Sequence, residues 1–175
     1  MRRVGISFTL FLIILAGFFA FSILNSPGGY IATGAGGWTQ VSWNYGGNAI
    51  VVLFDPVDPS IVYGGADVNG PFKSTDGGAT WNTTGLTFVV SQGRSIHRLL
   101  IHPTSPSIIF AATSVGIYKS SDNAASWAIV RSGEHWDMEF KPSDPTVLYA
   151  STISRIVKSS DTGNTWSILT TGLPP

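Results

Sequence analysis

One octapeptide occurs three times in the chain, and it constrains the fold more than any other feature. It reads STDGGATW at 74–81, SSDNAASW at 120–127 and SSDTGNTW at 159–166. Each copy combines hydroxyl side chains, an aspartate and a tryptophan, a mixture that fits neither an amphipathic helix nor a continuous strand. A motif that returns after 46 and then 39 residues indicates repeated architecture rather than a single active site.

A second phrase precedes each octapeptide at a nearly constant distance. The copies are FDPVDPSIVYGG from Phe54, IHPTSPSIIFAA from Ile101 and FKPSDPTVLYAS from Phe140. A unit of about 40 to 45 residues made of short strands has the length of one β-propeller blade. The sequence therefore predicts three blades, at 48–88, 95–132 and 134–171.

Turn residues bound four short strands in each unit, which we name by residue number. The first unit predicts strands at 49–54, 61–65, 71–74 and 81–84, the second at 97–101, 108–112, 116–120 and 127–131, and the third at 136–140, 147–151, 156–159 and 166–169. The first strand of each unit is nearly all apolar, so we expect it to be the most buried.

The octapeptide fits the turn between the third and fourth strands of each unit. We expect its aspartate to accept backbone N–H groups, its glycine to supply a positive φ, and its tryptophan to bury an apolar face. The residues given this structural role are Ser74, Asp76, Gly78, Trp81, Ser120, Asp122, Trp127, Ser159, Asp161, Gly163 and Trp166. In the second copy Ala124 replaces the glycine, so either Ala124 or Asn123 must carry the positive φ, and we expect that turn to be the weakest.

The pattern S-x-D-x-G-x-T-W after an aromatic strand resembles the Asp-box, or BNR, repeat of sialidase-like propellers. That superfamily includes sialidases, two-propeller xyloglucanases, sortilin-type receptors and photosystem II assembly propellers. The resemblance covers about residues 38 to 170. It implies an all-β propeller in which the box lies at the blade periphery and does no chemistry.

The N-terminus predicts export. Arg2 and Arg3 precede an uncharged apolar run from Val4 to Leu24, the layout of a secretory signal. The run is also long enough to cross a bilayer as a helix. Residues 1–26 are therefore either a cleaved signal peptide or a membrane anchor, followed by a glycine-rich linker at 27–37. Both alternatives make the protein extracytoplasmic, secreted or membrane-anchored.

The repeats do not complete a ring. Residues 38–42, WTQVS, match the segment that begins at each box tryptophan, so they predict an outer strand that belongs to a ring-closing blade. The predicted fold class is all-β, an incomplete propeller of three four-stranded blades at 38–175 with this extra strand, preceded by a hydrophobic helix. Since propellers need about four to eight blades, we expect missing blades or self-association to cover the open ends.

Composition excludes several kinds of function. Lys and Arg number 10 and Asp and Glu number 10, so no basic excess points to nucleic acid. The absence of cysteine removes thiolate metal sites. No spacing of His, Asp or Glu indicates a metal site, and no glycine-rich loop precedes a helix. We predict no metal and no cofactor.

Asp67 departs from the repeat, because Ser114 and Ile153 occupy its place in the other units. YGGADVNGPFKS resembles the first-blade motif of two-propeller xyloglucanases, in which the aspartate is the catalytic base. That resemblance implies a base at Asp67 and a ligand contact at Asn69. Ala66 and Asn69 differ from the family pattern, and the partner acid belongs to a second propeller. The alternative is an ordinary Asp in a hairpin turn before Asn-Gly.

A second candidate cluster lies at the start of the first strands. His97 and Arg98 in the second unit align with Trp136 and Asp137 in the third. This end of a blade borders the central channel, where an aromatic ring beside charges can bind a sugar. The alternative is that Trp136 fills a gap between blades and His135 is a solvated loop residue.

These observations support two functions of different classes. The first is a non-catalytic, extracytoplasmic propeller segment that binds polysaccharide or an extracellular protein. The second is the N-terminal portion of a xyloglucanase-like glycoside hydrolase. Because an inverting glycosidase needs two carboxyl groups, we expect no activity from the 175 residues alone. A third alternative is an assembly factor that recognises another protein.

Overall fold

The computed structural model describes residues 23–26, 29–32, 48–67, 70–86 and 95–170. The chain divides into two compact units, Met1–Asn44 and Tyr45–Pro175. In the first unit, β1 (Ile23–Ser26) pairs antiparallel with β2 (Gly29–Ala32), a hairpin that the sequence did not predict. No helix within the described ranges is long and apolar enough to cross a membrane. The expected leader helix and the strand at 38–42 lie outside those ranges.

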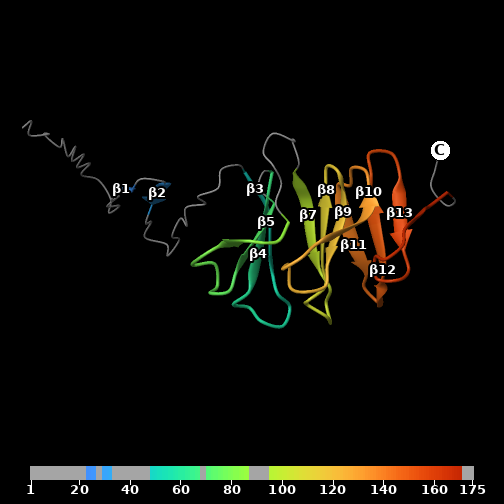
Figure 1. Cartoon of the computed structure of the whole chain (residues 1–175), viewed down its shortest axis with the longest axis horizontal. Helices are drawn as coiled ribbons and strands as arrows, with labels where there is room; N and C mark the ends of the chain where they lie inside the picture. The colour runs from blue at the N-terminus through green and yellow to red at the C-terminus, as the bar shows by residue number, and fades with distance from the viewer. Residues whose placement is uncertain (1–22, 27–28, 33–47, 68–69, 87–94, 171–175) are drawn as a thin grey trace, which may run out of the picture. The chain divides into compact units, whose positions relative to one another are not determined.

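The second unit contains three four-stranded antiparallel sheets, in which each strand pairs with the next along the chain (Figure 1). The first sheet contains β3 (Ala49–Phe54), β4 (Val62–Ala66), β5 (Pro71–Ser74) and β6 (Asn82–Thr83). The second contains β7 (Ile96–Ile101), β8 (Ile109–Thr113), β9 (Gly116–Ser120) and β10 (Ala128–Ser132). The third contains β11 (Asp137–Lys141), β12 (Asp144–Ser151), β13 (Ile156–Ser159) and β14 (Ser167–Ile168). The prediction of three four-stranded sheets is confirmed.

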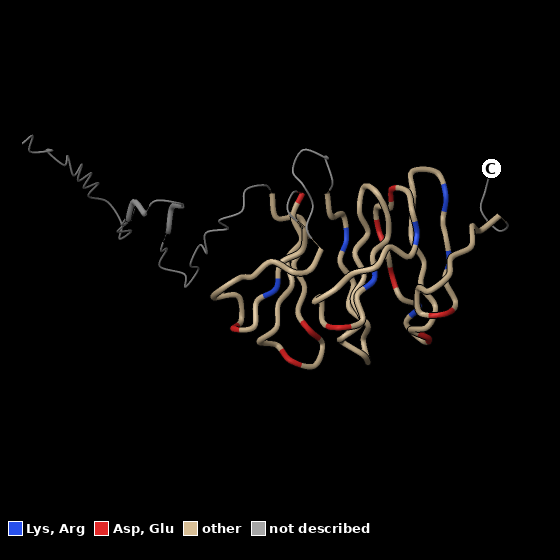
Figure 2. The backbone as a smooth tube through the Cα atoms, in the orientation of Figure 1, with Lys and Arg blue, Asp and Glu red and all other residues tan. Residues whose placement is uncertain are grey.

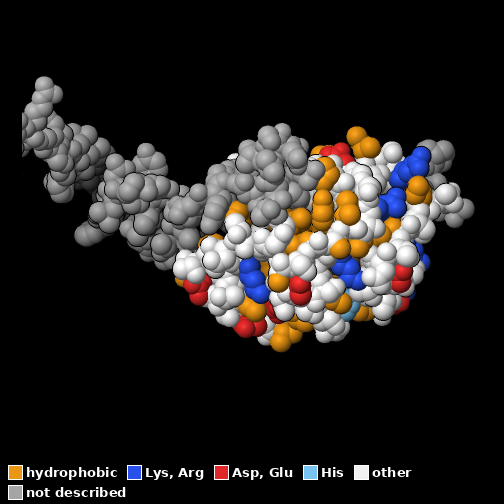
Figure 3. Space-filling view, viewed as in Figure 1, with side chains coloured by type: hydrophobic (Ala, Val, Ile, Leu, Met, Phe, Trp, Pro, Cys, Tyr) orange, Lys and Arg blue, Asp and Glu red, His pale blue; other side chains and the backbone are white. Residues whose placement is uncertain are grey.

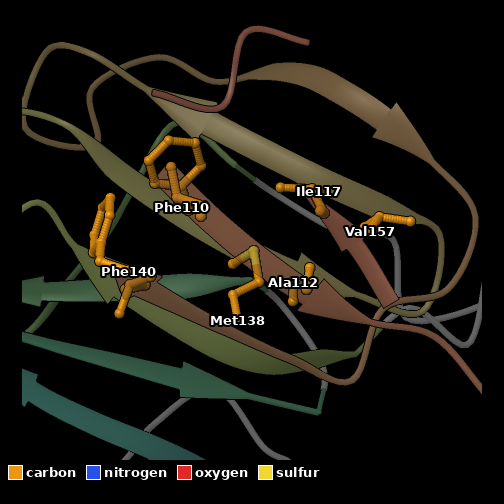
Figure 4. Close-up of a cluster of buried hydrophobic side chains, with 9 residues drawn as sticks. Phe110, Ala112, Ile117, Met138, Phe140 and Val157 are labelled. Carbon is orange, nitrogen blue, oxygen red and sulfur yellow. The ribbon is translucent and has the colours of Figure 1, made fainter. Parts of the chain in front are cut away.

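The sheets stand in a row, and two apolar clusters hold them together. Tyr63 of the first sheet packs with Leu99 and Ala111 of the second. Phe110 of the second packs with Phe140 and other residues of the third (Figure 4). The Phe110 and Phe140 rings meet edge to face, with their centroids 6.0 Å apart. Because a single sheet buries only one face well, each sheet depends on its neighbour for a core.

The first strands are less buried than the sequence suggested. The central strands β4 and β8 are wholly buried, whereas β3 alternates between exposed and half-buried positions. Ile50, Val52 and Phe54 of β3 are 48%, 66% and 60% exposed. Side chains alternate across a strand, so Val51 and Leu53 face the second sheet while these three face away from it. An apolar first strand is therefore buried only where another sheet packs on it.

Each octapeptide forms the same hydrogen-bonded turn between the third and fourth strands. In the first copy the Ser74 hydroxyl donates to Asp76 Oδ1 (2.7 Å) and accepts the Gly78 N–H (2.8 Å). Asp76 also accepts the Thr80 N–H and hydroxyl at 2.8 and 2.5 Å, and the Trp81 indole N–H donates to the Gly78 carbonyl (2.9 Å). The second and third copies repeat these bonds. The three aspartates therefore serve three separate turns.

The left-handed backbone of these turns spans two residues rather than one. The φ angles are 69° and 94° at Gly77 and Gly78, and 59° and 69° at Asn123 and Ala124. The sequence left open whether Asn123 or Ala124 carries the positive φ in the second copy. In the structure both residues do. Such a conformation costs a non-glycine residue about 1–2 kcal/mol. The second turn has two non-glycine residues at a positive φ, the third has one, Thr162 (φ 54°), and the first has none.

The turn hydrogen bonds make the fold sensitive to acid. The hydroxyl and N–H of Thr80, Ser126 or Thr165, with the preceding serine, lower the pKa of Asp76, Asp122 and Asp161 from 3.8 to about 2. Folding favours the ionised form, so this stabilisation is complete above about pH 4 and is lost as the pH falls through about 2. We expect the urea midpoint to fall over that range, and to fall less steeply in Asp122→Asn. Equal pH dependence in the two proteins would contradict this account.

Candidate functional site

An aromatic pair joins the starts of the second and third sheets. The His97 and Trp136 rings are stacked, with centroids 4.3 Å apart and planes 6° from parallel. His97 Nδ1–H donates to the His135 carbonyl (2.9 Å), and His97 Nε2 accepts the Ser95 hydroxyl (2.8 Å). These two bonds fix the imidazole against one face of Trp136. Trp136 is nevertheless 49% exposed, so part of this residue remains accessible to solvent.

Arg98 connects the same two sheets through ion pairs. Its Nη2 donates to Glu139 Oε2 at 3.1 Å, and its Nε lies 3.4 Å from Asp137 Oδ1. The Nε atom is buried and forms no hydrogen bond with a described residue, so its contact with Asp137 is purely ionic. The side chains of both acids are about two-thirds exposed. Their outer oxygens can therefore accept hydrogen bonds from a ligand while Arg98 keeps the carboxylates in place.

His135, whose carbonyl accepts the hydrogen bond from His97, is buried. The expectation that it is a solvated loop residue is therefore wrong. It is 1% exposed, its Nδ1–H donates to the Gly133 carbonyl (2.7 Å), and its Nε2 accepts the Arg131 Nε–H (3.1 Å). Burial lowers the pKa of His135, and the nearby Arg131 charge acts in the same direction. A neutral imidazole therefore anchors the loop whose carbonyl orients His97.

Asp67 follows β4 and closes the first sheet at the start of β3. Its Oδ1 accepts the backbone N–H of Asn48 (2.7 Å), and its Oδ2 accepts the Asn48 side-chain amide (3.0 Å). Its own N–H donates to the Asn48 carbonyl (3.1 Å). These three hydrogen bonds attach the residue after β4 to the residue before β3. Asn69 lies outside the described residues.

Sequence reasoning missed three members of these groups: Ser95, Glu139 and Asn48. The alternation of DMEFK at 137–141 places Asp137 and Glu139 on one face of β11, and this signal could have identified Glu139. Asn48 and Ser95 lie just before first strands, where the sequence carries no distinctive pattern.

The arrangement combines an exposed aromatic ring with exposed carboxylates. No group of three or more His, Asp or Glu side chains in the described ranges is placed to hold a metal ion. Figure 2 shows acidic and basic residues interspersed over the three sheets. The flat indole supplies a stacking surface, and Arg98 with its two acids supplies polar contacts beside it.

Comparison with known proteins decides what kind of sheets these are. No protein-family model matches the chain. An ancestral GH74 enzyme superposes with a TM-score of 0.62 at 23% identity, over 71% of this chain and 18% of the enzyme. The three sheets are β-propeller blades. YCF48 bound to a D1 peptide shares the fold, with a TM-score of 0.54 at 16% identity over 70% of this chain and 40% of YCF48.

The curated relatives that part of this chain resembles in sequence are xyloglucanases. A xyloglucanase from a Paenibacillus species is 37% identical over 111 residues, which cover 55% of this chain and 10% of the enzyme. The predicted resemblance to sialidase-like propellers, the two-propeller xyloglucanases among them, is confirmed. The chain spans about a tenth of the length of the curated relatives that it matches. It is thus a partial propeller similar to a part of those proteins.

Proposed function

We propose that these blades bind a xyloglucan-type β-glucan outside the cytoplasm, with Trp136 as the stacking platform. The observation that carries the proposal is the indole of Trp136, which His97 fixes on one face while about half of its surface is exposed. A pyranose ring presents C–H groups on its flat face, and these pack well on an aromatic ring. Because His97 is already hydrogen-bonded, the platform loses little conformational freedom when a sugar binds.

The charged residues beside the indole suit the rim of a sugar. Asp137 and Glu139 can accept hydroxyl hydrogens, and Arg98 holds both acids in position. Such charge-assisted hydrogen bonds are stronger than neutral ones and fix the orientation of the ring. The similarity to xyloglucanases supports this substrate class. The Arg2–Arg3 start and apolar run support an extracytoplasmic location.

The Trp136→Ala variant tests this function. We expect the dissociation constant for xyloglucan oligosaccharide, measured by isothermal titration calorimetry, to rise at least about tenfold, because removing one stacking ring costs about 1.4 kcal/mol or more. Ile153→Ala is the matched control, since Ile153 is an exposed apolar residue (86%) of the same blade. Equal losses in both variants would show that binding does not depend on the indole.

The glycoside hydrolase alternative rests on Asp67. We expect the 175-residue chain to release no reducing ends from xyloglucan, because an inverting mechanism needs a second carboxyl group about 6.5–9.5 Å away. The measurement is a reducing-sugar assay of the chain and of Asp67→Asn. Hydrolysis by the unmodified chain that disappears in Asp67→Asn would make Asp67 a catalytic base and contradict a purely non-catalytic role.

A further inference from the structure

Neighbouring blades share a contact at their outer corner. In the first blade the Lys73 ammonium lies 5.4 Å from the Tyr63 ring centroid. The Tyr63 hydroxyl and Lys73 Nζ both approach the Asn123 carbonyl of the second Asp-box turn, at 3.5 and 3.4 Å. The next residue, Ala124, packs in the same cluster as Tyr63 and is 2% exposed. An aromatic ring and a lysine of one blade thus hold the Asp-box turn of the following blade.

The second and third blades repeat this contact with shorter bonds. Lys119 Nζ lies 5.7 Å from the Phe110 ring centroid and donates to the Thr162 carbonyl (2.7 Å) and to Asn164 Oδ1 (2.8 Å). Gly163 packs directly on Phe110, since a Cβ added there would lie 2.7 Å from the ring Cζ. The same aromatic–lysine pair therefore recurs in both blades, as Tyr63 with Lys73 and as Phe110 with Lys119, and each pair contacts the Asp-box turn of the following blade.

The third blade has the equivalent aromatic–lysine pair, Tyr149 with Lys158, but no described Asp-box turn packs against it. Lys158 Nζ lies 5.9 Å from the Tyr149 ring centroid, but it donates no hydrogen bond to any described residue. Tyr63 and Phe110 are fully buried, whereas Tyr149 is half-buried. Figure 3 shows basic side chains at the surface over β13, the strand of Lys158. An Asp-box turn placed here would satisfy the ammonium and cover the ring.

At the other end of the row, the Asp-box turn of the first blade, with Gly77 and Gly78, is not in contact with an aromatic–lysine pair of another described blade. Gly77 is exposed, and a Cβ added to it would meet no described atom within 4 Å. Gly78 is half-exposed, although its equivalents Ala124 and Gly163 are buried. On the same blade, Ile50, Val52 and Phe54 are exposed. The first Asp-box turn therefore lacks the cover that the second and third turns receive from the preceding blade.

We propose that the Tyr149–Lys158 corner of one copy binds the first Asp-box turn, Gly77–Gly78, of a second copy. The two surfaces lie at opposite ends of the row of sheets, so two copies associate head to tail (Figure 1). Gly78 adds no Cβ, so it fits against Tyr149 as Gly163 fits against Phe110. Arg98 pairs with both nearby acids, Asp137 and Glu139, and its single positive charge offsets half of their negative charge at the junction. Such a heterologous contact extends or closes a ring.

A charge exchange tests this association without sugar, so its outcome does not depend on the proposed polysaccharide binding. By analogy with Lys119 and Asn164, Lys158 of one copy should contact position 79 of the other. Sedimentation equilibrium should show that Lys158→Glu raises the dissociation constant of self-association at least about tenfold. Adding Ala79→Lys to Lys158→Glu should restore most of the loss, because the opposite charges then face each other.

Lys141→Glu is the control, since it makes the same charge change at an exposed lysine of the same blade. We expect it to leave self-association within about twofold of the unmodified chain. Equal weakening by Lys141→Glu and Lys158→Glu, or no rescue by Ala79→Lys, would overturn the proposal. A strictly monomeric unmodified chain would overturn it in favour of another occupant of the corner.

Discussion

Replacing Phe110 by alanine should lower the free energy of unfolding by about 3–5 kcal/mol. Phe110 is fully buried between the second and third blades, where it contacts Phe140, Lys119 and Gly163. Removing the ring leaves a cavity at the corner where the third Asp-box turn is seated, and it removes the apolar partner of Lys119. Urea unfolding followed by circular dichroism measures the change.

Tyr149→Ala is the matched control, because Tyr149 occupies the same position in the third blade. No described turn packs on it, so in dilute, monomeric protein its removal should cost less than about 1.5 kcal/mol. Similar losses for Phe110→Ala and Tyr149→Ala would show that the stability at Phe110 does not come from holding the next blade.

The Gly163→Ala variant should lower the free energy of unfolding by about 2–4 kcal/mol. Two effects add: about 1 kcal/mol of backbone strain at a positive φ, and about 1–3 kcal/mol of overpacking against Phe110. Gly163 has φ 75°, and the added methyl would contact Phe110 Cε1 and Cζ. Thermal and urea unfolding give the value.

Gly133→Ala separates the two effects. Gly133 has φ 94°, but an added Cβ would meet no described atom within 4 Å. This variant should therefore lose only the strain of about 1 kcal/mol. Equal losses at Gly133 and Gly163 would mean that the contact with Phe110 carries no energy.

The repeat made most of the fold predictable. Each third strand, such as Pro71–Ser74, and the first strand β3 were predicted with their observed bounds, and the other strands shift by one to three residues. The largest shift is at β12, which starts at Asp144 because Asp144 pairs with Lys141 across a bulge. Turn chemistry is local, so three aligned copies fix where strands end.

Features that depend on neighbouring blades were not predictable from one strand at a time. The burial of a first strand depends on whether another sheet covers it, so β3, whose residues are all apolar, is less buried than β7, which includes His97 and Arg98. Arg98 is separated from Asp137 and Glu139 by about forty residues in the sequence, so these ion pairs depend on how the second and third sheets pack together. The burial of His135 follows from its contacts with Arg131 and Gly133, which no periodic pattern reveals.

A double-mutant cycle between Phe110 and Gly163 tests the blade-to-blade contact most directly. The four proteins are the unmodified chain, Gly163→Ala, Phe110→Leu, and the two changes combined, each unfolded in urea. Leucine leaves room for the added methyl, so Gly163→Ala should cost at least about 1 kcal/mol less in the Phe110→Leu background. Additive losses, with a coupling energy near zero, would contradict the claim that each blade holds the Asp-box turn of the next.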